Sequence, residues 1–386
     1  MNSPARFLHD CHDGLVTALA GRPRAVDHAP APHRGREWTV QSPGSFRMSN
    51  ALETAFYGCE RTPLDYAWPA ATMDELLDVL VTGDQGQIFF ADGSFYKPCI
   101  YPHQERLQIM RIRRPVSWLA REQDGLLFHL TGRNHENKGH FLLQHISRWL
   151  VARPVLEELG EYRILVAPGH SRWQRNLLRL VGADESRVVE GTQGTLRAQR
   201  LLHVPLAYGT NALSPPDHYR FIRDRAAEVE RRHPASPARP IFVSRRDAPD
   251  KRIENEDELI AAARKLLGQV EVFEFKGKTL EDQIVAFRRA PLIMGPIGQG
   301  ICNVLFAEGS LLVTLAPGTP EKEVYASSHG TQLALICGNQ AVTLYNGQAG
   351  ESRGNWTFPV DAFRAQLTRL LALPELAPLR QRLPPA

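Results

Sequence analysis

The second half of the chain repeats one pattern, a short apolar run followed by an amphipathic stretch, and this alternation constrains the fold more than any other feature. Helical spacing of apolar residues indicates a helix, and a short apolar run bounded by Gly, Pro or Asp indicates a buried strand. Strands are predicted at 241–244, 270–275, 292–294 and 311–315, and helices at 256–267, 279–289 and 299–306. Strands that alternate with helices form a parallel sheet with right-handed crossovers, so we expect an α/β layered domain.

The first half gives a weaker version of the same pattern. Apolar runs predict strands at 88–90, 126–130, 162–166 and 201–206. Helical spacing predicts helices at 73–81, 137–151, 173–181 and 214–232, and a last one at 361–372. On the helix at 137–151, His140, Gln144, Ser147 and Arg148 are spaced three to four residues apart, which predicts a polar stripe beside the apolar one. Asn255 is expected to cap the helix at 256–267, with Glu258 in a capping box.

The length of 386 residues predicts two principal domains, at about 100–200 residues for each. A Pro-rich break at 233–240 separates the two α/β patterns. We expect an N-terminal extension at 1–48 that is partly irregular, an α/β domain at 49–210 and a second at 211–345. The remainder, 346–386, is expected to form a helix and a tail that pack back on the N-terminal domain.

The loop Gly295-Pro-Ile-Gly-Gln-Gly300 follows a predicted strand and precedes a predicted helix. Glycines there allow a ligand close to the backbone, and the helix N-terminus favours a phosphate. The spacing matches neither a Walker A loop nor a dinucleotide fingerprint. A tight strand-to-helix turn with no ligand explains the loop equally well.

A second motif, Ser244-Arg245-Arg246-Asp247, lies at the carboxyl end of a predicted strand, and Arg252 follows shortly after it. Ligands of open α/β sheets bind outside the carboxyl ends of strands, and arginines suit a diphosphate there. The alternative is an exposed loop in which Arg252 pairs with Asp250 or Glu254. The acidic run at 254–258 is the favourable first turn of a helix, and no Asp-x-Asp motif for a divalent metal is evident.

Composition excludes several classes of protein. The net charge of +4 is too small for a whole-chain polycation, yet 220–252 holds ten Arg or Lys against five acids and 105–121 holds five Arg against one acid. No aromatic-basic platform indicates a nucleic-acid partner. The five cysteines are widely spaced and form no Cys-x-x-Cys pair, which favours a reducing cytosol. No apolar stretch has the length of a membrane span, so we expect a cytoplasmic protein, with peripheral membrane contact through a basic patch left open. The cluster at 9–13 has metal-ligand side chains but is interpreted as a solvated turn.

Taken together, 242–247, 252–258 and 295–306 resemble glycosyltransferase family 61, whose bacterial members include capsular-polysaccharide enzymes. The family carries an "SRRD…R.I.NE" stretch and a "GPHGAGLTN..F" loop in this order. Its "N..HF" helix start is similar to Asn137-Lys-Gly-His140-Phe141. The resemblance covers about 134–340.

The resemblance implies a GT-B architecture, in which two Rossmann-like domains face each other across a cleft. It implies an inverting transfer from a nucleotide-sugar donor to a glycan or glycolipid acceptor, with neither a cofactor nor an obligatory metal. On the matching positions, Arg245 and the backbone around Gly298–Gly300 would contact the diphosphate. Asn303 would stabilise that loop or the donor, and Glu256 would lie on the donor side. The full set of expected donor-binding residues is Ser244, Arg245, Arg246, Arg252, Glu256, Gly295, Pro296, Gly298, Gln299, Gly300 and Asn303.

Three positions depart from the family pattern. The loop histidine is Ile297, the acid of the following strand is Thr314, and the acid four residues after His140 is Gln144. An inverting transfer needs a base near the acceptor hydroxyl, and our hypothesis is that His140 serves, with Glu136 and then His170 as further candidates. A buried structural histidine is the competing interpretation of His140.

Two other functions remain open at this point. Ile297 and Thr314 are compatible with a GT-B-like protein that binds a nucleotide sugar or glycan without catalysis. A dinucleotide-dependent oxidoreductase or epimerase could use the same sheet, although the chain lacks a Gly-x-Gly-x-x-Gly loop followed by an acid about twenty residues later.

Overall fold

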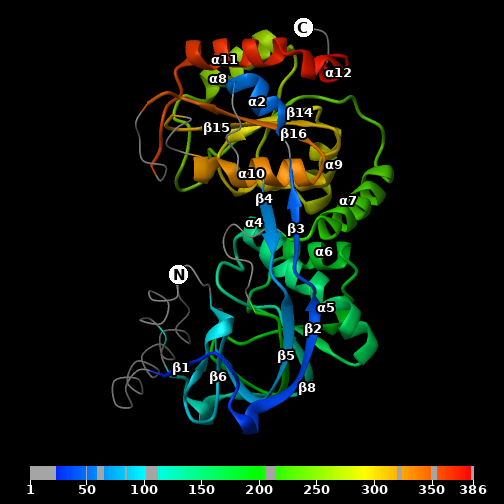
Figure 1. Cartoon of the computed structure of the whole chain (residues 1–386), viewed down its shortest axis with the longest axis vertical. Coiled ribbons are helices and arrows are strands. Elements are labelled where there is room, and N and C mark those ends of the chain that lie inside the picture. The colour runs from blue at the N-terminus through cyan, green and yellow to red at the C-terminus, as the bar shows by residue number, and fades with distance from the viewer. Residues whose placement is uncertain are drawn as a thin grey trace. The chain divides into compact units, whose positions relative to one another are not determined.

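The structure, a computed structural model, describes residues 23–48, 50–58, 65–82, 85–100, 112, 114–205, 214–319, 324–348 and 354–383 (Figure 1). It divides into two compact units. Unit 1 comprises Met1–Gly44 and Ala67–Ser214, and unit 2 comprises Ser45–Tyr66 and Pro215–Ala386. The chain therefore passes between the units three times. The expected boundary at 210–211 lies near the third passage, between Ser214 and Pro215.

Unit 2 is built on a parallel sheet in which the first strand of the run lies inside rather than at an edge. The order is β13 (Glu271–Phe273), β12 (Ile241–Val243), β14 (Leu292–Pro296), β15 (Leu311–Ala316) and β16 (Gln340–Tyr345). Every neighbouring pair is parallel. The four strands and the parallel pairing expected from the sequence are confirmed, and β16 is an addition.

Helices cover both faces of this sheet (Figure 1). On one face lie α8 (Glu256–Leu267), α11 (Val360–Ala372) and α2 (Ala51–Tyr57), and on the other lie α9 (Leu280–Arg289) and α10 (Val324–Ile336). Unit 2 also contains α7 (Pro216–Arg231), the 3₁₀ helices η7 (Gln299–Phe306) and η8 (Pro374–Leu376), and α12 (Ala377–Arg380). Because α8 and α9 lie on opposite faces, the strand order reverses after β13, as right-handed crossovers require.

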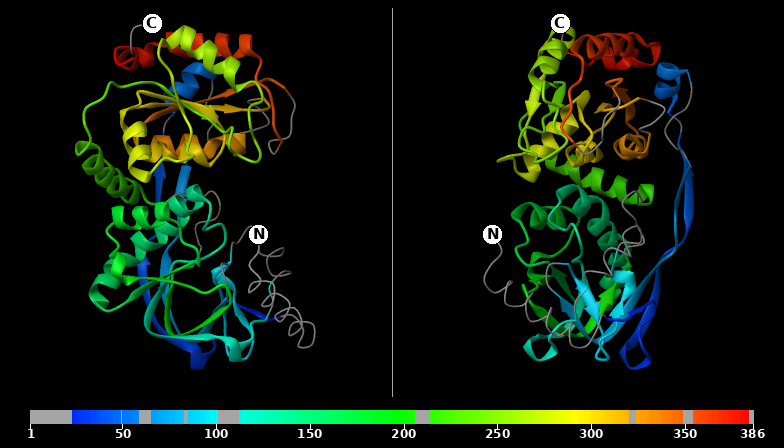
Figure 2. Two further views of the ribbon diagram at one scale, coloured as in Figure 1. Left: turned by 180° about the vertical axis from the view of Figure 1, so that it is seen from behind. Right: turned by 90° about the vertical axis from the view of Figure 1, so that its left-hand side faces the viewer.

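The core of unit 2 takes in pieces from both ends of the chain. Leu52 and Phe56 of α2 and Phe363 and Leu367 of α11 are buried in one cluster with strands β12, β14, β15 and β16. In both views of Figure 2 the blue α2 lies among the late elements of the chain. The expectation that 346–386 packs on the N-terminal domain is therefore wrong for α11, since its apolar stripe fits the face beside α8.

Unit 1 is built on a mixed nine-stranded sheet. Its order is β1 (Ala25–Val26), β7 (Phe95–Tyr96), β6 (Gln87–Phe89), β5 (Ala71–Thr82), β11 (Thr195–His203), β8 (Arg121–His129), β9 (Arg163–Val166) and β10 (Val188–Glu190), with β2 (Arg34–Gln41) also on β5. Strands β11, β8, β9 and β10 run parallel, whereas β5 is antiparallel to β11, β2 and β6. A separate pair joins β3 (Gly44–Arg47) and β4 (Asp65–Trp68).

The helical part of unit 1 follows the carboxyl ends of β8 and β9. The first segment runs through α4 (Lys138–His140), a π-helical turn η5 (Phe141–His145) and α5 (Ile146–Leu159), and α6 (Arg172–Leu180) follows β9. Short 3₁₀ turns are η1 (Ala31–His33), η2 (Lys97–Cys99), η4 (Ser117–Leu119) and η6 (Glu185–Arg187). The expected helices at 137–151 and 173–181 are confirmed. Within the first, the π-helical turn at Phe141–His145 departs from the α-helical spacing from which the polar and apolar stripes were predicted.

One expectation for unit 1 is wrong. Residues 73–81 form part of strand β5 rather than a helix, because this segment pairs with β11, β2 and β6. Its side chains do not alternate in burial, since the neighbours Glu75 and Leu76 are both buried. Within the N-terminal extension, residues 34–41 form strand β2, whose side chains are exposed or half-buried and show no apolar period. The cluster at 9–13 lies outside the described residues.

Where the chain is described, Cys99, Cys302 and Cys337 are buried free thiols. No described helix combines the length and apolar character needed to cross a bilayer.

Candidate functional site

The candidate donor site lies where the strand order of unit 2 reverses. From β12 the chain moves to β13 on one side, and it then crosses to β14 on the other. The carboxyl ends of β12 and β14 therefore flank a topological switch point, where open α/β sheets bind ligands. Ser244 and Arg245 follow β12, while Ile297 and Gly298 follow β14. Two motifs that are well separated in the sequence meet here.

Arg245 lies directly against the backbone of the glycine loop. A Cβ atom built on Gly298 would come within 2.2 Å of Nη1 of Arg245, and Gly298 has a φ of 152°, which L side chains rarely adopt. The Arg245 side chain is 15% exposed, and its Nη2 donates to the carbonyl of Asp250 at 3.1 Å. Burial lowers the pKa of Arg245, and Asp250 and Asp247 oppose that shift. Its Nε has no hydrogen-bond partner among the described residues, so the guanidinium keeps donor capacity beside the loop.

Glu256, at the start of α8, fixes the turn that carries Arg245. Its carboxylate accepts from the hydroxyl of Ser244 at 2.7 Å and from the backbone N–H of Arg245 at 3.2 Å. It also accepts from Nε of Arg246 at 2.9 Å. Glu256 is buried, so its charge is compensated inside the protein. Ser244, Arg246 and Glu256 therefore hold the turn that positions Arg245.

Two loop glycines permit close packing within unit 2. A Cβ on Gly295 would lie 2.7 Å from the carbonyl oxygen of Val243, and one on Gly300 would lie 2.7 Å from the ring of Phe275. Pro296 ends β14 and is buried, and Gln299 begins η7. Gly298 is thus the loop glycine whose missing side chain makes room for a cation.

Asn303 and Arg252 differ in their relation to the loop. The amide of Asn303 donates to the carbonyl of Gly300 at 3.1 Å, while its Oδ1 is buried with no hydrogen-bond partner in the described part of the chain. Arg252 is exposed, and its backbone pairs with Asn355 and Trp356. The structure therefore ties Asn303 to the loop and brings the Arg252 backbone to the 355–356 segment.

Asn255 occupies the N-cap position of α8 without the expected capping bond. Its side-chain amide instead donates to the carbonyl of Phe358 and accepts from the N–H of the same residue. The expected capping box is therefore wrong, because a partner about a hundred residues away uses both groups of the amide.

Two departures from the family pattern are buried in unit 2. Ile297 packs in an apolar cluster with Ala316 and Tyr345, against which Tyr57 of α2 also lies. Thr314 is fully buried in β15, and its hydroxyl finds no hydrogen-bond partner within the described ranges. At both positions the side chain is therefore buried in the interior of unit 2.

His140, the first choice for a base, has a defined proton arrangement. Its Nδ1 lies 3.1 Å from Oε1 of Gln144. Because an amide oxygen can only accept, the shared proton is on His140 Nδ1, and Nε2 holds the lone pair that a base needs. Burial lowers the pKa of His140; the bond to Gln144 opposes this and Arg133 adds to it. His140 is therefore neutral near pH 7.

The other two candidates differ in exposure. Glu136 is exposed in the turn that leads from β8 to α4. His170 follows β9, is buried, and meets the Phe141 ring edge-on at 5.2 Å between centroids. Burial lowers the pKa of His170 to about 4, with smaller contributions from Arg175 and His135. His140, Glu136 and His170 all follow the carboxyl ends of the neighbouring parallel strands β8 and β9.

The polar stripe of the 137–151 helix is interior, which its spacing alone does not indicate. Arg148 is fully buried and donates to the carbonyls of His129, Thr131 and Val204 at 2.6–3.2 Å. It thereby links the carboxyl end of β8 to that of β11 by hydrogen bonds. The signal that could have found it is the run of neutral, apolar residues around one arginine.

Among known families, residues 139–317 match the model described as Glycosyltransferase 61. This match supports the resemblance drawn from the motifs and, with it, a glycosyltransferase activity. It includes His140, the Arg245 motif and the glycine loop. No curated protein matches the chain. In the described part of the chain no three His, Cys, Asp or Glu side chains converge as metal ligands.

Proposed function

From the Glycosyltransferase 61 match as premise, we propose that this protein is an inverting hexosyl- or pentosyltransferase. It moves a sugar from a nucleotide-sugar donor to a glycan or glycolipid acceptor in bacterial surface-polysaccharide synthesis, such as that of a capsule. The proposal includes a GT-B arrangement, independence of metal ions, and a cytoplasmic location at the inner face of the membrane when the acceptor is a lipid.

The contact between Arg245 and Gly298 carries this proposal. A nucleotide-sugar donor leaves its diphosphate behind, and the negative charge that develops there needs fixed positive groups. Arg245 supplies a largely buried guanidinium with spare donors, and the first turn of η7 supplies backbone N–H groups and a positive dipole end. These groups stabilise a leaving diphosphate without a divalent cation.

His140 takes the proton of the acceptor hydroxyl in the proposed mechanism. Its Nδ1–H is held by Gln144, which leaves Nε2 to accept the proton as the new bond to the sugar forms. An amide holds the ring but lacks the negative charge with which a carboxylate would stabilise the imidazolium. The Gln144 departure therefore preserves the orientation of the ring and weakens it as a base.

Donor binding tests the proposal directly. Thermal unfolding of the full chain would be followed with UDP-, GDP-, dTDP- and CMP-sugars, since a ligand at 100 times its Kd adds about 2.7 kcal/mol of stability. We expect one nucleotide class to raise Tm in the wild type and in Arg220→Ala, an exposed surface arginine paired with Asp217. Arg245→Ala should lose the shift. No shift with any nucleotide sugar, or an equal shift in Arg245→Ala, would overturn the proposal.

A second candidate is a protein that binds nucleotide sugars without catalysis. The apolar packing of Ile297 and the burial of Thr314 favour it, because each replaces a group that could contact a ligand. Release of nucleoside diphosphate from the bound donor, with water or a glycan as acceptor, decides between the two. Binding without release by wild-type protein would support the non-catalytic function.

A further inference from the structure

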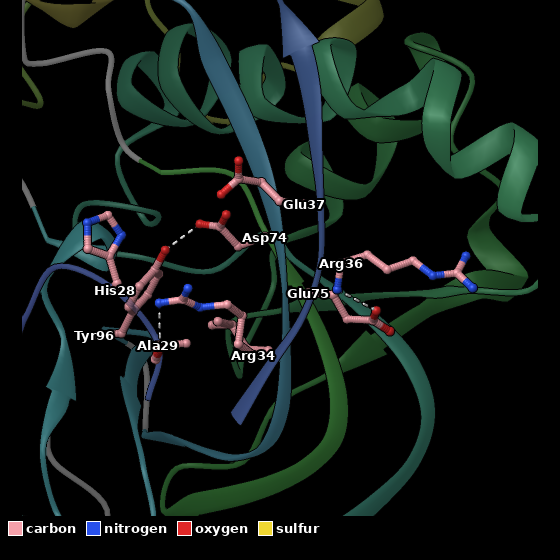
Figure 3. Close-up of a pocket in the computed structure, with 9 residues that line it drawn as sticks. His28, Ala29, Arg34, Arg36, Glu37, Asp74, Glu75 and Tyr96 are labelled. Carbon is pink, nitrogen blue, oxygen red and sulfur yellow. Dashed lines mark hydrogen bonds between the residues drawn. The ribbon is translucent and has the colours of Figure 1, made fainter. Parts of the chain in front are cut away.

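A cavity of about 280 Å³ opens in unit 1 beside strands β2, β5 and β7 (Figure 3). Its lining residues all belong to unit 1, and they include neither His140 nor the glycine loop, which belongs to unit 2. Polar side chains from three strands meet around it, among them Arg34, Glu37, Asp74 and Tyr96. Its volume lies just below the range of about 300–1,000 Å³ that holds drug-sized ligands, so it suits one small ring.

Asp74 is the central acceptor of this cavity. The hydroxyl of Tyr96 donates to its Oδ2, as Figure 3 shows. Burial raises the pKa of Asp74, the bond from Tyr96 opposes this, and the neighbouring carboxyl of Glu37 raises the pKa further. The two carboxyl groups are therefore close enough to compete for one proton, and a ligand hydroxyl between them would relieve that competition.

The charges around the cavity are largely balanced. Glu75 is paired with Arg200 at 2.6 Å and accepts from the backbone N–H of Arg36 at 3.1 Å. One nitrogen of the Arg34 guanidinium donates to the carbonyl of Ala29 at 3.1 Å, and His28 also lines the cavity (Figure 3). The cavity thus offers cationic donors and carboxylate acceptors side by side.

We propose that this cavity binds one ring of a neutral saccharide, with Asp74 and Glu37 accepting from its hydroxyls and Arg34 donating to them. A saccharide hydroxyl both donates and accepts, so it can satisfy both kinds of lining group. A phosphate would meet the two carboxyl groups, and an isolated cation would meet the guanidinium. The inference rests on the proposed function, because a glycan acceptor or a donor sugar would supply the ring.

Ligand-observed NMR on the full chain tests this binding. The probes are maltose, cellobiose, lactose and xylobiose, with UDP-glucose and inorganic phosphate as separate arms. We expect saturation transfer to at least one disaccharide in the wild type, a loss of at least fivefold in Asp74→Asn and in Tyr96→Phe, and no transfer to phosphate. The matched control is Asp78→Asn, which changes a carboxylate of the same strand that pairs with exposed Arg197 outside the cavity.

Each result has one meaning. A disaccharide signal that depends on Asp74 assigns the cavity to a glycan chain. A signal for the glucose protons of UDP-glucose that is lost in Asp74→Asn, without any disaccharide signal, assigns it to the donor sugar. Three results would overturn the proposal. They are no saccharide signal in the wild type, signals in Asp74→Asn and Tyr96→Phe as strong as in the wild type, and a loss in Asp78→Asn as large as that in Asp74→Asn. Circular dichroism of each variant checks that it is folded. Failure of donor binding at Arg245 would overturn the proposed function and leave a disaccharide result unaffected.

Discussion

Nη1 of Arg245 occupies the space that a side chain on Gly298 would need, since a Cβ atom there would lie 2.2 Å away. Two motifs from successive parts of the parallel sheet are thus interlocked at a single residue pair. The contact holds the guanidinium over the loop in the absence of a ligand, which would reduce the rotamer entropy lost when the proposed donor binds.

Gly298→Ala should displace Arg245 and weaken donor binding at least tenfold. The substitution introduces a steric clash with the guanidinium in addition to backbone strain of about 1–3 kcal/mol. Gly277→Ala is the control, because Gly277 has a φ of 76° and a Cβ added there would meet no described atom within 4 Å, so it adds strain alone. Titration calorimetry with the nucleotide sugar identified by thermal shift measures both. Equal donor affinity in the two variants would contradict the interlock.

Glu256→Ala should destabilise unit 2 markedly. It leaves the Ser244 hydroxyl and the Arg245 N–H without their acceptor, at about 1–3 kcal/mol for each buried group left unpaired. Asp257→Ala removes an exposed carboxylate that also binds Arg246 and should cost about 0–1 kcal/mol. Urea unfolding of the two variants gives the comparison, and similar losses would show that Glu256 does not organise the turn.

Gln144→Glu should move the acidic limb of the pH profile of kcat/KM to higher pH. A carboxylate beside Nδ1 stabilises the imidazolium and raises the pKa of His140, which burial lowers in the wild type. In the wild type that limb is expected below the ordinary histidine value of about 6.5. His140→Ala should reduce kcat strongly with saturating acceptor, and near-full turnover in that variant would remove His140 from the mechanism.

Acid should destabilise unit 1 between about pH 6.5 and pH 4. The pKa of buried His170 is lowered to about 4 in the folded chain, so the unfolded chain binds the proton first as the pH falls. Stability from this group is complete above the unfolded pKa and decreases towards pH 4, with a slope of up to about 1.4 kcal/mol per pH unit. His170→Gln should reduce the slope of the urea midpoint against pH in this window, while the other buried histidines of unit 1, whose pKa values burial also lowers, retain their part of it. An unchanged slope would show that His170 does not titrate there.

The sequence predicted unit 2 well because its signals are local. Each strand there is a short apolar run and each crossover helix carries its own stripe, so Ile241–Val243 and Leu259–Leu267 are recognisable without knowledge of their partners. The edge proposed to bind a donor was predicted from Arg245 and the glycine loop. Both motifs lie at the point where the strand order reverses. This position depends on which strands pair with one another, and a short stretch of sequence does not reveal that.

What the sequence missed depends on contacts between distant residues. Asn255 looks like an ordinary cap, yet its amide is used by Phe358. The 73–81 segment lacks the alternation of a half-buried strand, because Glu75 and Leu76 are both buried and so are Val79 to Val81. Arg148 stands on a stripe that resembles a solvated helix face, and its burial follows from carbonyls on two strands that converge on it.

Because Ser45–Tyr66 belongs to unit 2, the ribosome makes one part of that unit long before the rest. Tyr57 donates its hydroxyl to the carbonyl of Thr343 at 2.5 Å, across a separation of 286 residues. At about 5–20 residues per second, α2 emerges roughly 15–60 s before the strand it binds. During that interval Leu52 and Phe56 have no complete sheet to cover, and the nascent chain must be kept from aggregating until β16 has been made.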